Sequence, residues 1–168
     1  SIQVLLRRAN HNNTIRTFSH ASSSSRSSLD GQREAILEAS LEQVHEYGWT
    51  GDAIAAGVLQ SQCPPLSIGL VEGGESDLVA YFMNQCNHRL NRELSKDSQW
   101  VNKWRSDRTP MAQRLEDAIR LRLEMTLPFC KSQRWHEGMA LGASGTNAAT
   151  TARQLDEMVT IIVTAVTS

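Results

Sequence analysis

The chain has 168 residues, of which 40% are hydrophobic and 21% charged, and its formal net charge is −1. This composition is typical of a globular chain and excludes an intrinsically disordered one. No apolar run in the sequence approaches the ~20 residues of a membrane-spanning helix. The three cysteines, at 63, 86 and 130, are far apart and odd in number, which argues against a zinc site or a closed disulfide framework.

The first 30 residues differ from the rest of the chain in composition. They contain four arginines, many serines and one acid, Asp30. An arginine-rich, serine-rich and acid-poor segment is typical of a mitochondrial transit peptide, whose positive charge suits movement toward a negative-inside matrix. We therefore interpret residues 1–30 as a mitochondrial transit peptide, with a disordered leader as the alternative.

After this leader, the sequence predicts three short helices. Apolar residues recur at helical spacing over 33–47. A second helix is expected over 53–59, with Thr50 or Asp52 as its N-cap. Two prolines begin a third short helix, over 65–71. Strand signals are nearly absent, because β-branched and aromatic residues are sparse and do not alternate.

Longer helices follow. The first is predicted over 76–94, with Ser76 as its N-cap. The second covers 110–127 and begins with a proline at its first helical position, after the cap Thr109. Residues 148–167 give another helix with one apolar face. Three short helices before long ones are typical of a helix-turn-helix head joined to a helical ligand-binding body.

We therefore predict an all-α fold with two parts after the leader. Residues 31–75 form a helix-turn-helix-like head, and residues 76–168 form part of a helical body.

The predicted head lacks the side chains that hold DNA. Residues 34–88 contain eight acids and no lysine or arginine. Four of these acids recur every four residues and so share one helix face: Glu34, Glu38, Glu42 and Glu46. A protein that binds duplex DNA draws most of its affinity from cations that neutralise phosphates. We therefore expect no nucleic-acid partner.

No pattern in the sequence indicates catalysis. Cys86 and His88 could suggest a nucleophile beside a base, but helix positions i and i+2 point about 200° apart. No carboxylate pair, metal-ligand cluster or catalytic triad emerges. We predict that the protein is not an enzyme and has no catalytic residue, no metal and no cofactor.

Three segments of the chain resemble a known family: REAILEASLEQVHEYGWTGDAIAAG from Arg33, SDLVAYFMNQCNHRL at 76–90, and AIRLRLEMTLPF at 118–129. They are similar to the mitochondrial ubiquinone-biosynthesis accessory proteins, a family with a TetR-like fold that binds lipid instead of DNA. The most specific patterns are N-Q-C-N-x-R-L and R-L-R-L-x-M…P. The resemblance covers roughly residues 31–166.

The resemblance implies a lipid-binding accessory protein of ubiquinone biosynthesis. Members hold the polyprenyl tail of a quinone intermediate and present its ring to a di-iron demethoxyubiquinone hydroxylase, without performing the chemistry themselves. It also implies the matrix side of the mitochondrial inner membrane, contact with the membrane surface and a possible homodimer. The family carries docking and membrane helices further downstream, so we expect the helical body to be incomplete at its C-terminus and transfer no residue for those roles.

The apolar faces of the body suggest where an isoprenoid tail would lie. Such a tail gains ~25 cal/mol for each Å² removed from water, so its receptor needs aliphatic walls. The same spacing is also the usual pattern of plain core. We expect a tunnel lined by seven residues: Phe82, Leu115, Ile119, Leu123, Leu155, Met158 and Ile162.

A TetR-like DNA-binding transcription regulator is the alternative function. The lack of cations over 34–88 argues against it, and a DNA shift assay at low ionic strength separates the two. If the apolar faces of the body are only partly covered, self-association is expected as well.

Overall fold

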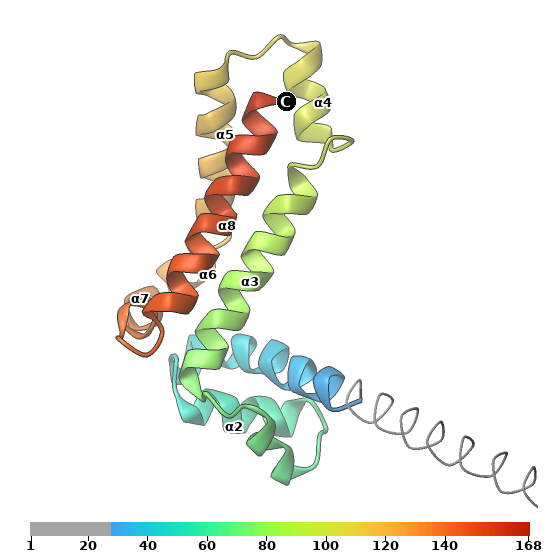
Figure 1. The fold of residues 1–168 in the computed structure, drawn as a ribbon. Helices are drawn as coiled ribbons and strands as arrows, with labels where there is room; N and C mark the ends of the chain where they lie inside the picture. The colour runs from blue at the N-terminus through green and yellow to red at the C-terminus, as the bar shows by residue number, and fades with distance from the viewer. Residues whose placement is uncertain (1–27) are drawn as a thin grey trace, which may run out of the picture.

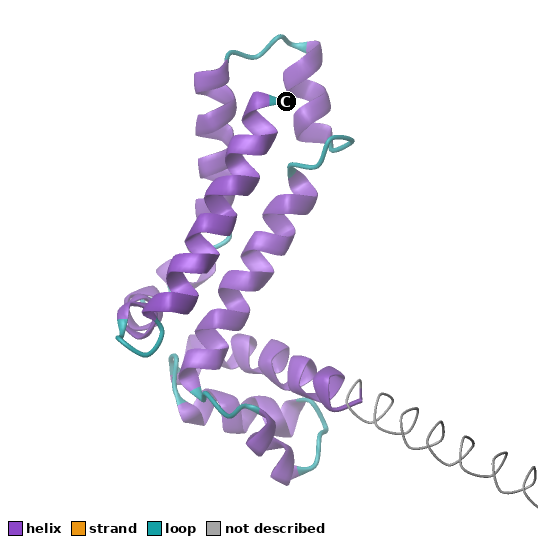
Figure 2. Cartoon of the chain, in the orientation of Figure 1, coloured by secondary structure: helices purple, strands orange, loops and turns teal. Residues whose placement is uncertain are grey.

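The computed structural model of the chain describes residues 28–168, which form helices and no strand (Figure 1, Figure 2). The predicted transit peptide falls almost entirely on residues 1–27, outside the described part. None of the described helices is long and apolar enough to cross a bilayer. The elements are an N-terminal helix over 28–47, α2 (Gly51–Gln60), the 3-10 helix η1 (Pro65–Leu70), α3 (Glu75–Glu93), α4 (Gln99–Ser106), α5 (Met111–Glu124), α6 (Leu127–Lys131), α7 (Trp135–Ala143) and α8 (Ala148–Thr167).

The helices are arranged as a small head below an elongated body (Figure 1). The N-terminal helix, α2 and η1 form the head, and α3 leads from it into the body. There α8 packs against both α3 and α5. This arrangement confirms the predicted all-α fold with a helix-turn-helix-like head and a helical body.

The head has a small apolar core at the contact between its first two helices. Thr50 is the N-cap of α2, because its hydroxyl accepts a hydrogen bond from the Ala53 N–H (3.4 Å). Gly57 lies where α2 approaches the N-terminal helix closely, and a Cβ there would come 2.6 Å from the backbone nitrogen of Ser40. The buried apolar residues are Ile36, Leu37, Val44, Ala53, Ile54 and Val58.

The third short helix differs from the prediction. Residues 65–70 form the six-residue 3-10 helix η1, and none of them is buried. Pro65 has no N–H to give, and Gly69 has a low helix propensity. Because no residue of η1 is buried, its contacts with α2 contribute little to offset the cost of forming an α-helix.

Two helix starts also differ from the prediction. α3 begins one residue before the expected cap, Ser76, and the carboxylate of Asp77 accepts a hydrogen bond from the Gly73 N–H (3.0 Å). The hydroxyl of Ser76 instead accepts from Asn147 Nδ2 (2.8 Å), which ties α3 to the start of α8. α5 begins after Pro110, whose extended backbone makes it the N-cap.

Buried amide side chains join α3 to α8. Asn87 donates through Nδ2 to the Gln154 carbonyl (2.9 Å) and to Glu157 Oε2 (3.0 Å). Gln154 donates through Nε2 to Asn84 Oδ1 (2.7 Å) and to the Ala80 carbonyl (2.9 Å). Asn84 and Asn87 are the two asparagines of the N-Q-C-N pattern, so this pattern fixes how α8 lies on α3.

An aromatic cluster joins the head to the body. Its centre is Phe82 of α3, whose ring lies 4.9 Å from Phe129, 5.6 Å from Trp135 and 5.7 Å from Trp49, measured between ring centroids. All three contacts are edge-to-face, the geometry that aromatic quadrupoles favour. Trp49 follows the N-terminal helix, while Phe129 and Trp135 come from α6 and α7, so the cluster holds three parts of the chain together.

An ion pair beside this cluster fastens α7 to the head. Arg134 and Glu137 are paired at 2.8 Å, and Glu137 Oε2 accepts a hydrogen bond from the Trp49 N–H (3.1 Å). Arg134 also donates to the Glu46 carbonyl (3.0 Å). Gly48 has a φ of +74°, which favours glycine, and a Cβ at this position would collide with the Glu137 carboxylate.

We expect Glu137→Gln to lower the free energy of unfolding at neutral pH and the difference from wild type to shrink in acid. The hydrogen bond from Arg134 lowers the pKa of the Glu137 carboxyl below its ordinary 4.5, and the Trp49 N–H acts in the same direction. The stabilisation is therefore present above the ordinary pKa and lost as the pH falls through the lowered one. Urea unfolding of both proteins from about pH 7 to about pH 3 measures this. A difference that does not change with pH would contradict it.

Candidate functional site

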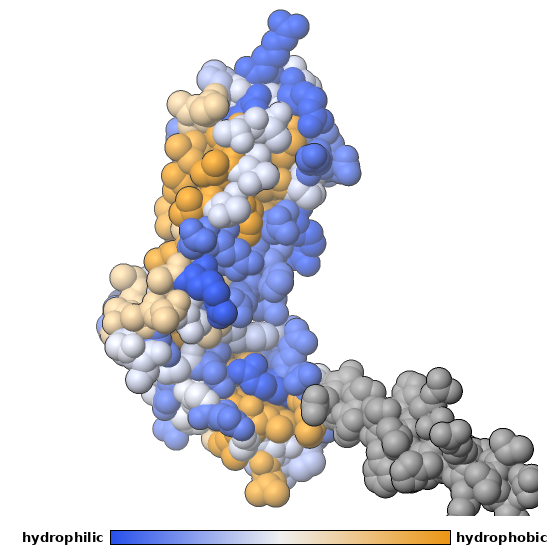
Figure 3. Space-filling view, viewed as in Figure 1, coloured by the Kyte–Doolittle hydropathy of each residue, from blue (hydrophilic) through white to orange (hydrophobic). Residues whose placement is uncertain are grey.

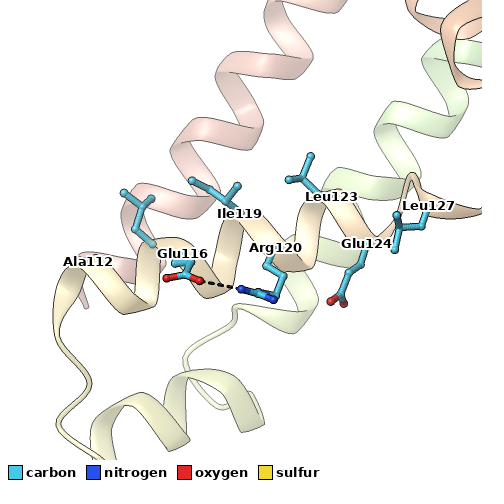
Figure 4. A pocket seen from close by; sticks show the side chains of 8 residues that line it. Ala112, Glu116, Ile119, Arg120, Leu123, Glu124 and Leu127 are labelled. Carbon is cyan, nitrogen blue, oxygen red and sulfur yellow. Dashed lines mark hydrogen bonds and ion pairs between the residues drawn. The ribbon is translucent and has the colours of Figure 1, made fainter. Parts of the chain in front are cut away.

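Three of the seven predicted site residues lie together on the outer face of α5. Leu115, Ile119 and Leu123 are spaced four apart and are 42%, 44% and 59% exposed. Figure 4 shows Ile119 and Leu123 pointing to the same side of the helix. Leu127, at the start of α6, continues the row and is also exposed. We call Leu115, Ile119, Leu123 and Leu127 the α5 stripe.

The α5 stripe lines an open groove of about 660 Å³. Glu116 and Arg120 border it and form an ion pair with each other at 2.8 Å. Both side chains are more than half exposed, so this pair adds little stability. The sequence led us to expect a tunnel. In the part of the chain that the structure describes, the α5 stripe instead lines an open, apolar groove with a polar edge.

The three predicted residues of α8 differ in exposure. Leu155 is exposed, Met158 is half-buried and Ile162 is buried. Val159 and Val163 continue the outward row from Leu155 at a spacing of four and are about half exposed. These two valines and Leu127 were not among the seven predicted residues, although their i+4 spacing could have identified them.

Figure 3 shows hydrophobic surface gathered over the part of the body that contains α5 and α8. α5 and α8 pack against each other in this part of the body.

Phe82 lies away from this surface. It is buried at the centre of the aromatic cluster between head and body, and it also lines a smaller hollow. Ile162 is likewise part of the hydrophobic core. Four of the seven predicted residues, at 115, 119, 123 and 155, therefore face outward, Met158 is intermediate, and two face inward.

A second, smaller hollow of about 290 Å³ lies between the N-terminal helix, α3 and α6. Cys86 lines it but is buried, and burial raises the pKa of its thiol. A raised pKa keeps the thiol protonated and unreactive at neutral pH. His88 is exposed two positions further along α3, so the structure does not pair it with Cys86. Within residues 28–168, no three His, Cys, Asp or Glu side chains gather as metal ligands would.

The described helices form a helix-turn-helix-like head on a helical body with an apolar outer face, which is the arrangement of a TetR-like helical protein. Its residues 34–88 carry no lysine or arginine. Comparison with known proteins narrows this class. Residues 31–58 match the family described as "Ubiquinone biosynthesis protein COQ9, N-terminal domain". The chain belongs to the COQ9 family.

Curated relatives agree with this family. Over 127 residues, the chain is 33% identical to ubiquinone biosynthesis protein COQ9-B, mitochondrial, of Xenopus laevis, a match that covers 76% of the chain and 43% of that protein. It is 31% identical over 106 residues to human COQ9, covering 63% and 33% of the two chains. It is 34% identical over 113 residues to the probable COQ9 of Dictyostelium discoideum, covering 67% and 36%. The chain thus spans less than half the length of these relatives, all of which are named mitochondrial.

Proposed function

We propose that this chain serves in ubiquinone biosynthesis as a non-catalytic protein that binds an isoprenoid quinone intermediate along the α5 stripe. It presents the ring of this lipid to a demethoxyubiquinone hydroxylase, on the matrix side of the mitochondrial inner membrane. The names of the relatives support the pathway and the compartment. The hydroxylase and the membrane surface as partners come from the family resemblance.

The α5 stripe is the observation that carries the lipid assignment. It is a row of four aliphatic side chains, all of them exposed, along an open apolar groove. A hydrocarbon tail laid along this row would remove apolar surface of both partners from water, at ~25 cal/mol for each Å². The groove offers no fixed cation beyond Arg120, which is already paired with Glu116, so it suits a neutral chain better than an anion.

We expect Ile119→Glu to abolish most of the isoprenoid lipid that copurifies with the chain. The substitution places a charge at the middle of the α5 stripe, where a hydrocarbon tail would have to desolvate it. Native mass spectrometry followed by lipid extraction measures the bound fraction.

Leu66→Glu is the matched control for this experiment. It adds the same charge at a position that is also exposed, but it lies in the head. Equal lipid in wild type and both variants, or a wild-type protein that carries no isoprenoid lipid, would contradict the proposal.

Self-association is a second candidate use of the same surface. The outward row of α8, formed by Leu155, Val159 and Val163, adds exposed apolar surface to the body beside the α5 stripe's groove-lining residues. Exposed apolar faces of this kind are typical of protein or membrane contacts. We expect size-exclusion chromatography with light scattering to show dimers or larger oligomers of the chain. A monomer at all concentrations would exclude this use.

A further inference from the structure

α2 and η1, two of the three elements of the head, expose three large aliphatic side chains. Leu59, in the last turn of α2, is 75% exposed, and Leu66 and Ile68 of η1 are 90% and 44% exposed. α2 and η1 contact each other, and Figure 3 shows hydrophobic surface at the lower end of the molecule. We call Leu59, Leu66 and Ile68 the head patch. It belongs to the opposite part of the molecule from the α5 stripe.

The charged side chains of the segment that contains the head patch are all acidic, and Arg33, just outside this segment, is paired with Asp77 (3.0 Å). Residues 34–88, which include it, carry eight acids and no lysine or arginine. Glu42 is exposed and accepts a hydrogen bond from Gln60, the neighbour of Leu59. Glu72 is exposed two residues after η1. The head patch therefore combines bare aliphatic surface with a segment whose formal charges all have one sign.

This combination excludes two of the partners that an exposed head could have. A nucleic acid would meet carboxylates where it needs cations. An anionic bilayer surface would meet the same repulsion, since juxtamembrane segments are held there by lysine and arginine. A positively charged protein segment with one apolar face has the complementary chemistry. Grooves that bind such amphipathic helices use apolar pockets for anchors at helical spacing.

We propose that the head patch is a docking surface for a basic, amphipathic segment of a partner protein. The apolar face of the segment covers Leu59, Leu66 and Ile68, and its cations face Glu42 and Glu72. η1 occupies the position of the recognition helix of a helix-turn-helix. In DNA-binding helix-turn-helix proteins this surface contacts DNA. In this chain, the same surface binds a cationic polypeptide.

The test uses a labelled 18-residue helical peptide with leucines on one face and lysines on the other, titrated with the full chain by fluorescence anisotropy. Replacing Leu59, Leu66 and Ile68 together by serine should weaken binding at least about tenfold. The variant Leu115→Ser, Ile119→Ser, Leu123→Ser is a matched control, because it removes the same two leucines and one isoleucine from the body. It should bind the peptide like wild type.

Two further measurements address the charges and the fold. The variant Glu42→Lys, Glu72→Lys should weaken peptide binding, and added salt should weaken it for wild type. Circular dichroism of the head-patch variant should match wild type, because exposed positions contribute little to stability. The same variant should keep its copurified lipid, which separates this proposal from the lipid function of the body.

Four results would overturn the proposal. They are no binding of the lysine peptide, equal binding of a peptide with glutamates in place of the lysines, equal loss in the two serine variants, and capture of the chain through the head patch by vesicles of phosphatidylcholine and phosphatidylglycerol. The last result would make the head patch a membrane contact.

Discussion

Phe82→Ala is expected to lower the free energy of unfolding by about 3–5 kcal/mol. Phe82 is buried and lies within 5.7 Å of three other aromatic rings, so its removal leaves a cavity and breaks three edge-to-face contacts. Those rings belong to the head, α6 and α7, and the loss should therefore loosen the head from the body. Urea unfolding, followed by tryptophan fluorescence and by circular dichroism, measures both effects.

Leu123→Ala is the control for this prediction. Leu123 is 59% exposed on the α5 stripe, so its truncation should change the free energy of unfolding by less than about 0.5 kcal/mol. Measuring bound lipid as well as stability in the Phe82→Ala protein separates the two roles considered for Phe82, which are lining a lipid site and packing in the core. A Phe82→Ala protein that unfolds like wild type but carries no isoprenoid lipid would show that Phe82 lines a lipid site and would refute its role in the core.

Gly57→Ala is expected to disrupt the head and to lower the free energy of unfolding by about 3 kcal/mol or more. A Cβ at Gly57 would lie 2.6 Å from the backbone nitrogen and 2.7 Å from the Cα of Ser40 on the N-terminal helix. Backbone atoms cannot rotate away as a side chain can, so α2 and the N-terminal helix would have to separate. Hydrogen exchange should then show faster exchange in the head than in α3 and α8.

Gly51→Ala is the matched substitution in the same helix. A Cβ at Gly51 would meet only Glu75 Oε1 at 3.5 Å, an ordinary contact. Alanine there should be neutral or stabilising by up to about 1 kcal/mol, because it restricts the unfolded chain. If both alanine variants unfold alike, close packing at Gly57 is not what holds the head together.

Most of the fold could be predicted from the order and period of the apolar residues. The helix predicted over 148–167 is α8 (Ala148–Thr167), and the one predicted over 33–47 lies inside the described N-terminal helix. Such long periodic segments are the most reliable signals in a sequence. The ends of the helices were less predictable, because Asp77 and Ser76 are both good capping residues and only the fold decides which partner each one meets.

The candidate site could be predicted only in part. The spacing of Leu115, Ile119 and Leu123 places them on one face of a helix whatever surrounds it. Spacing alone does not show whether other helices cover that face. The predicted site therefore also included Ile162 and Phe82. In the structure, Ile162 packs into the core, and Phe82 packs in the aromatic cluster between head and body.

The sequence by itself determined that the chain is helical, that residues 34–88 carry no lysine or arginine, and which residues share a helical face. Period and charge are properties of one segment, so they are readable before any packing is known. Only the tertiary structure decided which apolar faces are buried and which remain bare, including the head patch at Leu59, Leu66 and Ile68. Burial depends on which neighbouring helices pack over a face, and that is a property of segments far apart in the chain.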